Sequence, residues 1–299
     1  MFKKIQNFNF LKLKHLALAF FIASFFIFFF LPFGSQAAGP TWVYGVIDED
    51  QIWTKENSPY IIGWQENGLI LRAKLTIQPG TVIKIYGNKW WHQFYGLKVE
   101  GNNNGSLQIL GISDEPVIFT SYFDDSYYGD TDGFEGLFAE PGDYQGVTFV
   151  NDNNSSIQNT EFNYCGSAFG NEGCLVFDNS DLNFTNIKIR QSLNPGVLVK
   201  NNSQAGLDNL DASENSNEVL QLNDKSRIIL NNSNLYHNHG NYLFRISAGS
   251  DLLLETNNSF NDNDNLLIKL DQYLVENSVT WHNYGLPYFA MGSLFLDSS

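Results

Sequence analysis

The sequence feature that most constrains the fold is a repeat in the second half of the chain. Serines that each precede an apolar cluster recur at spacings of 23 or 24 residues, and a column of leucines keeps the same phase. Self-similarity at a fixed period of this size is the signature of a solenoid, in which each repeat packs on the next. The two columns are Ser156, Ser180, Ser203, Ser226 and Ser250, and Leu175, Leu198, Leu220, Leu243 and Leu267.

A third column has asparagine in the pattern apolar-x-Asn-x-x-apolar. It comprises Asn159, Asn186, Asn209 and Asn232, and Thr256 continues it 24 residues later. Asparagine tolerates the left-handed backbone conformation, and its amide can bond to the next asparagine in a stack. The column therefore predicts a stacked turn and implies no chemistry.

Each repeat has room for two or three short strands and none for a helix. Stacked at about 4.8 Å, such strands pair their backbone groups with the coils above and below. We therefore predict an all-β fold, a right-handed parallel β-helix with coils of about 22–24 residues. A leucine-rich repeat has a similar period, but the gaps between the apolar runs here are polar and rich in Gly or Asn, which disfavours its convex-face segment.

The first 38 residues differ in kind from the rest. Four lysines precede an apolar run from Leu16 to Phe33, and small residues follow up to Ala38. This order predicts an export signal cleaved after Ala37 or Ala38, and hence a secreted or cell-surface protein. The alternative is an uncleaved membrane anchor, because the run approaches the roughly 18 residues of a spanning helix. We place an N-terminal lead-in or cap segment at 39–64 and the β-helix at 65–276.

Charge narrows the range of partners. The chain has 17 basic and 32 acidic residues, a net charge of -15, and loss of residues 1–38 would remove four lysines and no acid. Such a surface repels phosphate backbones, so no nucleic-acid partner is expected, and contact with a membrane is expected only through an uncleaved N-terminus.

The two cysteines lie nine residues apart around a glycine-rich segment. In an oxidising compartment Cys165 and Cys174 could form a disulfide. Alternatively they are two small buried residues that never meet. The sequence leaves both interpretations open.

Two phrases carry a family resemblance: LTIQPGTVIKI at Leu75–Ile85 and DEPVIFTS at Asp114–Ser121. They resemble those of exported bacterial right-handed parallel β-helix repeat proteins, of the pectate-lyase-like solenoid superfamily in the broad sense. The resemblance covers about residues 53–299. It implies an extracellular or surface protein, usually without assigned chemistry, with polysaccharide lyases and hydrolases as distant relatives.

The end of the chain repeats its beginning. The pattern Trp-x5-Pro-Tyr at Trp53–Tyr60 recurs at Trp281–Tyr288, and the segment before Leu75 aligns with Ser293–Ser299. We therefore expect residues 277–299 to be the start of a second, truncated module, or else a terminal cap.

An acidic insertion, formed by Phe123–Gly133 with Glu135 following, is the candidate metal site. Alternating carboxylates with glycines are the oxygen ligands that Ca²⁺ prefers, although the spacing is not that of an EF-hand, and a solvated loop is the alternative. No cofactor is otherwise required. The candidate ligands are Asp124, Asp125, Asp130, Asp132 and Glu135.

A row of cations is the candidate catalytic site. Alternation places Tyr242 and Leu266 inward, so that Lys200, Arg245 and Lys269 project outward together. Such a row could hold an acidic sugar or, beside Ca²⁺, remove a proton as in a β-elimination lyase. The alternative is a solvated face.

Paired carboxyls for glycoside hydrolysis have candidates in Asp208, Asp211 and Glu161, but acids are too common to single out a pair.

Aromatic and histidine residues complete the candidates. Trp90, Trp91 and Tyr95 could stack on sugar rings or cover the core. His237 and His239 are spaced for a metal pair, but no third ligand is evident in the sequence.

Together these features predict an exported β-helix protein with a structural, adhesive or glycan-binding role and no identifiable catalytic site. Its partner would be a polysaccharide or another cell-envelope component. The alternative is a lyase or glycoside hydrolase that acts on an acidic polysaccharide.

Overall fold

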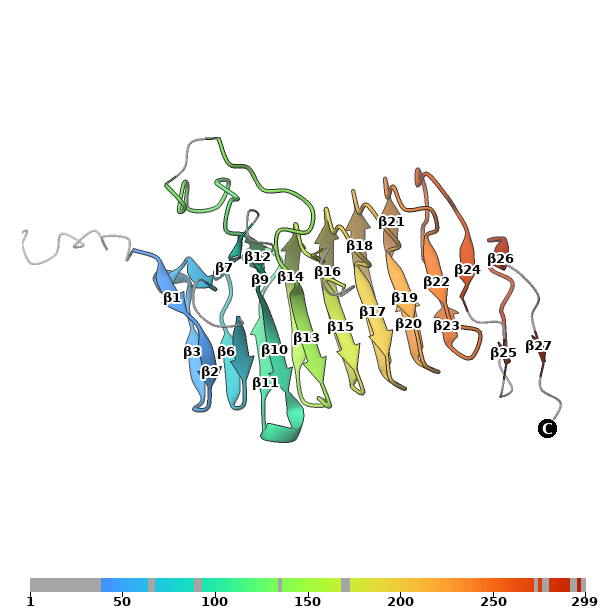
Figure 1. Cartoon of the computed structure of the whole chain (residues 1–299), viewed down its shortest axis with the longest axis horizontal. Helices are drawn as coiled ribbons and strands as arrows, with labels where there is room; N and C mark the ends of the chain where they lie inside the picture. Colours follow the sequence, from blue (N-terminus) through green and yellow to red (C-terminus); the bar gives the residue numbers. More distant parts are fainter. Residues whose placement is uncertain are drawn as a thin grey trace, which may run out of the picture. The chain divides into compact units, whose positions relative to one another are not determined.

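The computed structural model describes residues 39–63, 68–88, 93–133, 136–167, 173–271, 274–275, 280–290 and 295–296. Within them the chain winds into a parallel β-helix of about nine turns (Figure 1). No helix of this described part is long and apolar enough to cross a membrane. The predicted export segment, residues 1–38, lies outside the described residues.

Two parallel sheets form the walls of the β-helix. The 13-stranded sheet contains β1 (Thr41–Val43), β3 (Gln51–Trp53), β4 (Tyr60–Ile62), β6 (Lys74–Ile77), β7 (Val82–Ile85), β11 (Ser106–Leu110), β12 (Val117–Ser121), β14 (Ser156–Asn163), β16 (Asp181–Arg190), β18 (Gln204–Ser213), β20 (Arg227–Asn231), β21 (Asn234–Tyr236) and β23 (Asp251–Leu254). The 10-stranded sheet contains β2 (Gly45–Ile47), β5 (Leu69–Leu71), β10 (Gly96–Glu100), β13 (Gly146–Val150), β15 (Leu175–Asp178), β17 (Val197–Lys200), β19 (Leu220–Leu222), β22 (Phe244–Ile246), β24 (Ile268–Leu270) and β26 (Tyr288–Ala290).

The remaining elements are short. Strands β8 (Gly87–Asn88) and β9 (Gln93–Phe94) pair in antiparallel fashion, and β25 (Leu274–Val275) pairs with β27 (Phe295–Leu296) in parallel. Two single-turn 3-10 helices, η1 (Lys55–Asn57) and η2 (Gly101–Asn103), connect strands.

Register stacks apolar side chains into one core that runs along the β-helix. In the 10-stranded sheet, Leu175, Val197, Leu220, Phe244 and Ile268 follow one another from coil to coil, and each is fully buried. Because equivalent positions repeat, one apolar residue per coil extends the same core. The predicted fold class is therefore confirmed.

The serine column is a hydrogen-bonded ladder. The backbone N–H of Ser180 donates to Ser203 Oγ at 3.0 Å, and that of Ser203 donates to Ser226 Oγ at 3.1 Å. The prediction for Ser156 is wrong: it is exposed, and Asp152 takes the equivalent place by donating its N–H to Ser180 Oγ. The reason is that the connection between β14 and β15 lengthens this coil: Val150 pairs with Asp178, 28 residues further on, whereas Asp178 pairs with Lys200 after 22.

The asparagine column is confirmed as a left-handed turn. Asn159, Asn186, Asn209 and Asn232 all have φ between 46° and 61°. Asn209 Nδ2 donates to Asn186 Oδ1 at 2.7 Å. The continuation is Asn257 (φ 57°) and not Thr256, since Asn257 Nδ2 donates to Asn232 Oδ1 at 3.0 Å.

Coil length is regular only from β15 to β24, where equivalent residues are 22–24 positions apart as predicted. Ile268 and Tyr288 are only 20 positions apart, and Leu97 pairs with Val147 across the acidic insertion. The stack also extends beyond the predicted limits of 65–276, because β1 pairs with β4 and β26 pairs with β24. Backbone pairing does not require the repeat sequence, so strands outside the repeats join the stack.

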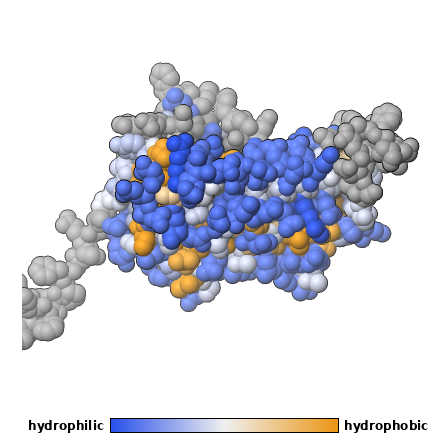
Figure 2. All heavy atoms as spheres, turned by 90° about the horizontal axis from the view of Figure 1, so that it is seen from below, coloured by the Kyte–Doolittle hydropathy of each residue, from blue (hydrophilic) through white to orange (hydrophobic). Residues whose placement is uncertain are grey.

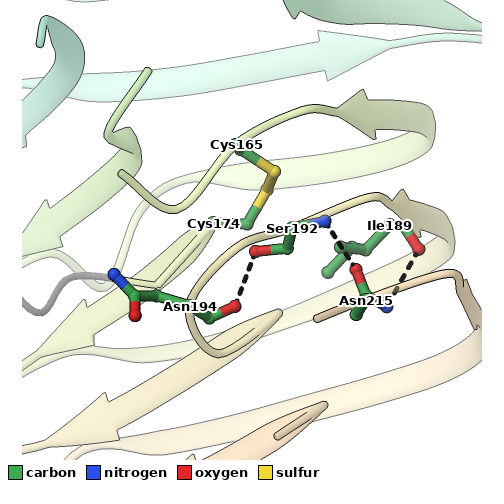
Figure 3. Close-up of a disulfide and its surroundings, with 6 residues drawn as sticks. All are labelled: Cys165, Cys174, Ile189, Ser192, Asn194 and Asn215. Atoms are coloured by element: carbon green, nitrogen blue, oxygen red, sulfur yellow. Dashed lines mark hydrogen bonds between the residues drawn. A yellow bond between two sulfur atoms is a disulfide. The ribbon is translucent and has the colours of Figure 1, made fainter. Parts of the chain in front are cut away.

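A disulfide joins Cys165 to Cys174, with their Cα atoms 5.0 Å apart (Figure 3). Next to it, the backbone N–H of Ser192 donates to Asn215 Oδ1, and Asn215 Nδ2 donates to the carbonyl of Ile189. The bridge thus lies beside Asn215, which belongs with Asn238 and Asn263 to a second ladder of asparagines that the sequence columns did not reveal.

Candidate functional site

A groove of about 340 Å³ runs along the outer face of β14, β16 and β18. Its lining includes three members of the asparagine column and residues one or two positions after them on the same strands. It is lined by Ser113, Pro116, Asn159, Thr160, Glu161, Asn186, Ile187, Lys188, Asn209 and Asp211.

Charges of alternating sign occupy the groove in one register. Glu161 lies beside Lys188, and Lys188 lies beside Asp211 on the next coil. Lys188 Nζ donates to Glu161 Oε1 at 2.6 Å. Each of these residues comes two positions after a left-handed asparagine, so the strand periodicity fixes all three side chains outward.

Arg190 extends this cluster toward the next turn. Its guanidinium donates to Ser213 Oγ at 2.9 Å and to Asp211 Oδ1 at 3.3 Å. Tyr236 Oη lies 3.4 Å from Arg190 Nη1 and from Asp211 Oδ1. The Arg190 side chain is therefore held in place by three neighbours, which favours a fixed orientation over a mobile one.

The acidic insertion reaches the same cluster. Burial, together with the nearby charge of Glu161, raises the pKa of the Tyr127 hydroxyl. Tyr127 belongs to the insertion between β12 and β13, so a residue of this segment lies within electrostatic reach of Glu161 and Arg190.

Each groove carboxylate is paired with a cation and not with the other carboxylate. Inverting and retaining glycosidases need two carboxyls that cooperate across one bond. Here Lys188 separates Glu161 from Asp211, and each carboxylate faces a cation. Asp208, the third carboxyl considered, accepts a hydrogen bond from Asn232 Nδ2 at 2.7 Å within the asparagine column.

The insertion brings together three of the predicted calcium ligands. Oxygens of Asp125, Asp130 and Asp132 lie within 4.8 Å of one another. Asp124 is not among them, because it is buried and accepts hydrogen bonds from Thr120 Oγ1 at 2.5 Å and from Ser126. The fifth candidate, Glu135, lies outside the described residues. Three carboxylates are a partial ligand set for Ca²⁺.

A buried lysine lies beneath these acids. Lys84 is completely inaccessible to solvent, and its Nζ donates to Gly129 O at 3.1 Å and to Thr131 Oγ1 at 2.9 Å. Burial lowers the pKa of Lys84, and the nearby Asp124 and Asp125 act in the opposite direction. An ammonium group therefore already offsets part of the loop's negative charge.

The predicted basic row is wrong in its register. Arg245 pairs with Lys269, whereas Lys200 pairs with Asp178 and lies two positions further along its strand. Tyr242 and Leu266 are not inward, because the regular strands begin only at Phe244 and Ile268.

These cations also have anionic partners. Lys200 Nζ lies 3.5 Å from Asp178, Lys269 Nζ lies 3.0 Å from Asp271, and Arg245 pairs with Asp271 and with Glu218. The three side chains thus do not form a joint basic surface.

The predicted aromatic platform is only partly described. Trp90 and Trp91 lie outside the described residues. Tyr95 is 9% exposed and packs against Tyr86, with ring centroids 5.9 Å apart, so its ring belongs to the core. Figure 2 shows one long face on which hydrophilic side chains predominate and apolar ones form small separate patches.

Sequence reasoning missed Lys188 and Arg190. The signal was available, because positions two and four residues after each column asparagine point outward on adjacent coils. Aligning those offsets places Glu161, Lys188 and Asp211 in one row.

Comparison with known proteins adds no relative: no family model, curated protein or solved structure matches the chain.

Proposed function

We propose that this chain is a secreted or cell-surface β-helix scaffold that binds a polysaccharide in the groove over β14, β16 and β18 without cleaving it. The observation that carries the proposal is the row Glu161, Lys188 and Asp211, with Arg190 beside it. The proposed location rests on residues 1–38, in which lysines are followed by an apolar run and then by small residues.

A linear polymer suits this groove for two reasons. Equivalent side chains recur about every 4.8 Å along the axis of stacked strands, so a chain of small repeating units can make similar contacts on successive coils. Carboxylate, ammonium, guanidinium and amide groups all hydrogen-bond to sugar hydroxyls, and Lys188 and Arg190 can also pair with a sugar carboxylate.

The test measures binding and cleavage together. The full chain is run in affinity gels that contain neutral or acidic polysaccharides, with and without Ca²⁺, while reducing ends and unsaturated products are followed. We expect retardation by at least one polysaccharide without product. Lys188→Ala and Arg190→Ala should each weaken retardation several-fold.

Lys98→Ala is the matched control. Lys98 is 47% exposed and pairs with Glu100 at 3.1 Å on the 10-stranded sheet, whereas Lys188 is 46% exposed and pairs with Glu161. Equal losses in both variants, or no retardation by any polysaccharide, would refute the proposed groove. Product that disappears in Asp211→Asn would instead establish the hydrolase or lyase alternative.

A further inference from the structure

Three successive turns at one corner of the β-helix share an out-in-out arrangement. Their central residues are Asn215, Asn238 and Asn263, which point inward, and the flanking side chains point to solvent. These turns are Glu214–Ser216, His237–His239 and Asp262–Asp264. The outer side chains therefore form a grid whose members come from adjacent coils.

Backbone hydrogen bonds fix the grid. Glu214, His237 and Asp262 are left-handed, with φ of 58°, 52° and 56°. Glu214 N–H donates to His237 O at 3.1 Å, and His237 N–H donates to Asp262 O at 3.0 Å. The three Cα atoms consequently follow the stacking direction, and Glu214 lies directly beside His237.

Two imidazole nitrogens face the two oxygens of one carboxylate. His237 Nδ1 lies 3.7 Å from Glu214 Oε1, and His239 Nε2 lies 3.4 Å from Glu214 Oε2. On the opposite side of the ring, His239 Nδ1 lies 3.2 Å from Asp264 Oδ2. The third candidate ligand, which the sequence alone did not reveal, is therefore the carboxylate of Glu214 on the preceding coil.

We propose that Glu214, His237 and His239 form a binding site for Zn²⁺, with Asp264 as the residue that orients His239. Two imidazoles and one carboxylate are a ligand set that zinc uses in proteins, and a water completes the tetrahedron. Ligand atoms about 2.1 Å from a tetrahedral ion lie about 3.4 Å from each other. The two nitrogen–oxygen distances, 3.4 and 3.7 Å, run to different oxygens of Glu214, so both imidazoles have to turn toward one of these oxygens to complete the tetrahedron.

Asp264 has the place of an outer-shell carboxylate. A metal-bound histidine usually donates its other ring N–H to a carboxylate, which fixes the tautomer and the ring orientation. With the proton on Nδ1 directed to Asp264, the Nε2 lone pair of His239 points toward Glu214. The site is thus chemically distinct from the all-oxygen cluster of the acidic insertion, which suits a hard cation.

The support beneath the site is rigid while its ligands can adjust. Asn215 is fully buried and Asn238 is 2% exposed, and Asn215 Nδ2 donates to Asn238 Oδ1 at 2.8 Å. Side chains of Glu214, His237 and His239 are about half exposed, so small rotations can close them around an ion without repacking the core.

The test is a Zn²⁺ titration by calorimetry of the full chain, freed of metal and purified without a histidine tag. We expect a site that is lost in His239→Asn, Glu214→Gln and His237→Asn; asparagine keeps the left-handed backbone of His237 available. Asp264→Asn should weaken Zn²⁺ binding about 10- to 100-fold. Unchanged far-ultraviolet circular dichroism of each variant establishes that the fold is kept.

His282→Ala, at a histidine elsewhere in the described part, is the control and should bind as the parent does. Imidazole NMR signals of His237 and His239 should shift on addition of Zn²⁺, and those of His282 should not. Absence of Zn²⁺ binding, or binding that persists in His239→Asn and Glu214→Gln, would overturn the proposal.

Discussion

Asn215 lies one coil before Asn238, and both its backbone N–H and its Nδ2 donate to Asn238 Oδ1, at 3.2 and 2.8 Å. Asn238 in turn donates to Ala212 O at 3.0 Å and to Asn263 Oδ1 at 2.8 Å. Each asparagine in this buried ladder therefore satisfies backbone groups that face the interior, where an unpaired polar group is costly.

Asn238→Ala should destabilise the protein by about 3 kcal/mol, because it leaves the Asn215 amide and the Ala212 carbonyl without these partners. Urea unfolding followed by circular dichroism measures the change. The exposed Asn241→Ala is the control and should stay within about 0.5 kcal/mol of the parent. Similar midpoints for the two variants would show that the ladder contributes no stability.

The period of the sequence predicted the fold because a solenoid repeats its core, so identical side chains recur at equal spacing. The same logic failed locally wherever a coil gained residues. Ser156 lost its place to Asp152 because the coil that follows it is longer than the others, and Thr256 lost its place to Asn257. A one-residue change of register moves a side chain to a different row, and no single repeat reveals where the extra residue lies.

The candidate sites were harder to predict because they combine side chains from different coils. Glu214 and His239 are 25 residues apart and become neighbours only through the stack. Lys200 was placed with Arg245 by strand alternation alone, but the register separates them by two positions. Ion pairs between side chains, such as that of Lys188 with Glu161, can be predicted once the coils are aligned on the left-handed asparagines.

The disulfide should stabilise the middle of the β-helix. Cys165 and Cys174 are separated by nine residues, and closure of a loop of this size in the unfolded chain is worth about 2.5 kcal/mol. In the double variant Cys165→Ala and Cys174→Ala, the free energy of unfolding should therefore be lower by about that amount, and the urea midpoint should fall accordingly. The reduced parent protein should match the variant; a parent whose midpoint is insensitive to reductant would contradict the expectation.

Glu100 should make stability depend on acid pH. Hydrogen bonds from Arg72 and then Lys98 lower the pKa of its carboxyl from 4.5 to about 2. A carboxyl with a lowered folded-state pKa stabilises the protein above its unfolded pKa, and this contribution is lost as the pH falls from about 4.5 through 2. Stability of the parent and of Glu100→Gln should therefore converge across that window.

Carbon-13 NMR of the Glu100 side chain measures its midpoint directly. Arg72→Ala should raise the Glu100 pKa toward 4.5, since Arg72 Nε donates to Glu100 Oε2 at 2.8 Å. A midpoint that is already near 4.5 in the parent, or that does not move in Arg72→Ala, would rule out this origin of the acid sensitivity.

Lys84 should hold the acidic insertion against the outer face of β7. Its Nζ is the donor to Gly129 O and Thr131 Oγ1, and the residue is fully buried beneath the loop. Lys84→Met keeps much of the apolar stem but removes both hydrogen bonds, so the loop should open more often. We expect faster cleavage by chymotrypsin after the exposed Tyr128, measured by mass spectrometry, and a loss of about 1–2 kcal/mol in global stability.

Lys74→Met, at a lysine that is 53% exposed and 3.9 Å from Asp50, should leave the cleavage rate unchanged. If Lys84→Met is cleaved no faster than Lys74→Met, then contacts other than the lysine hold the insertion, such as the packing of Tyr122 and Phe123 on Ile61.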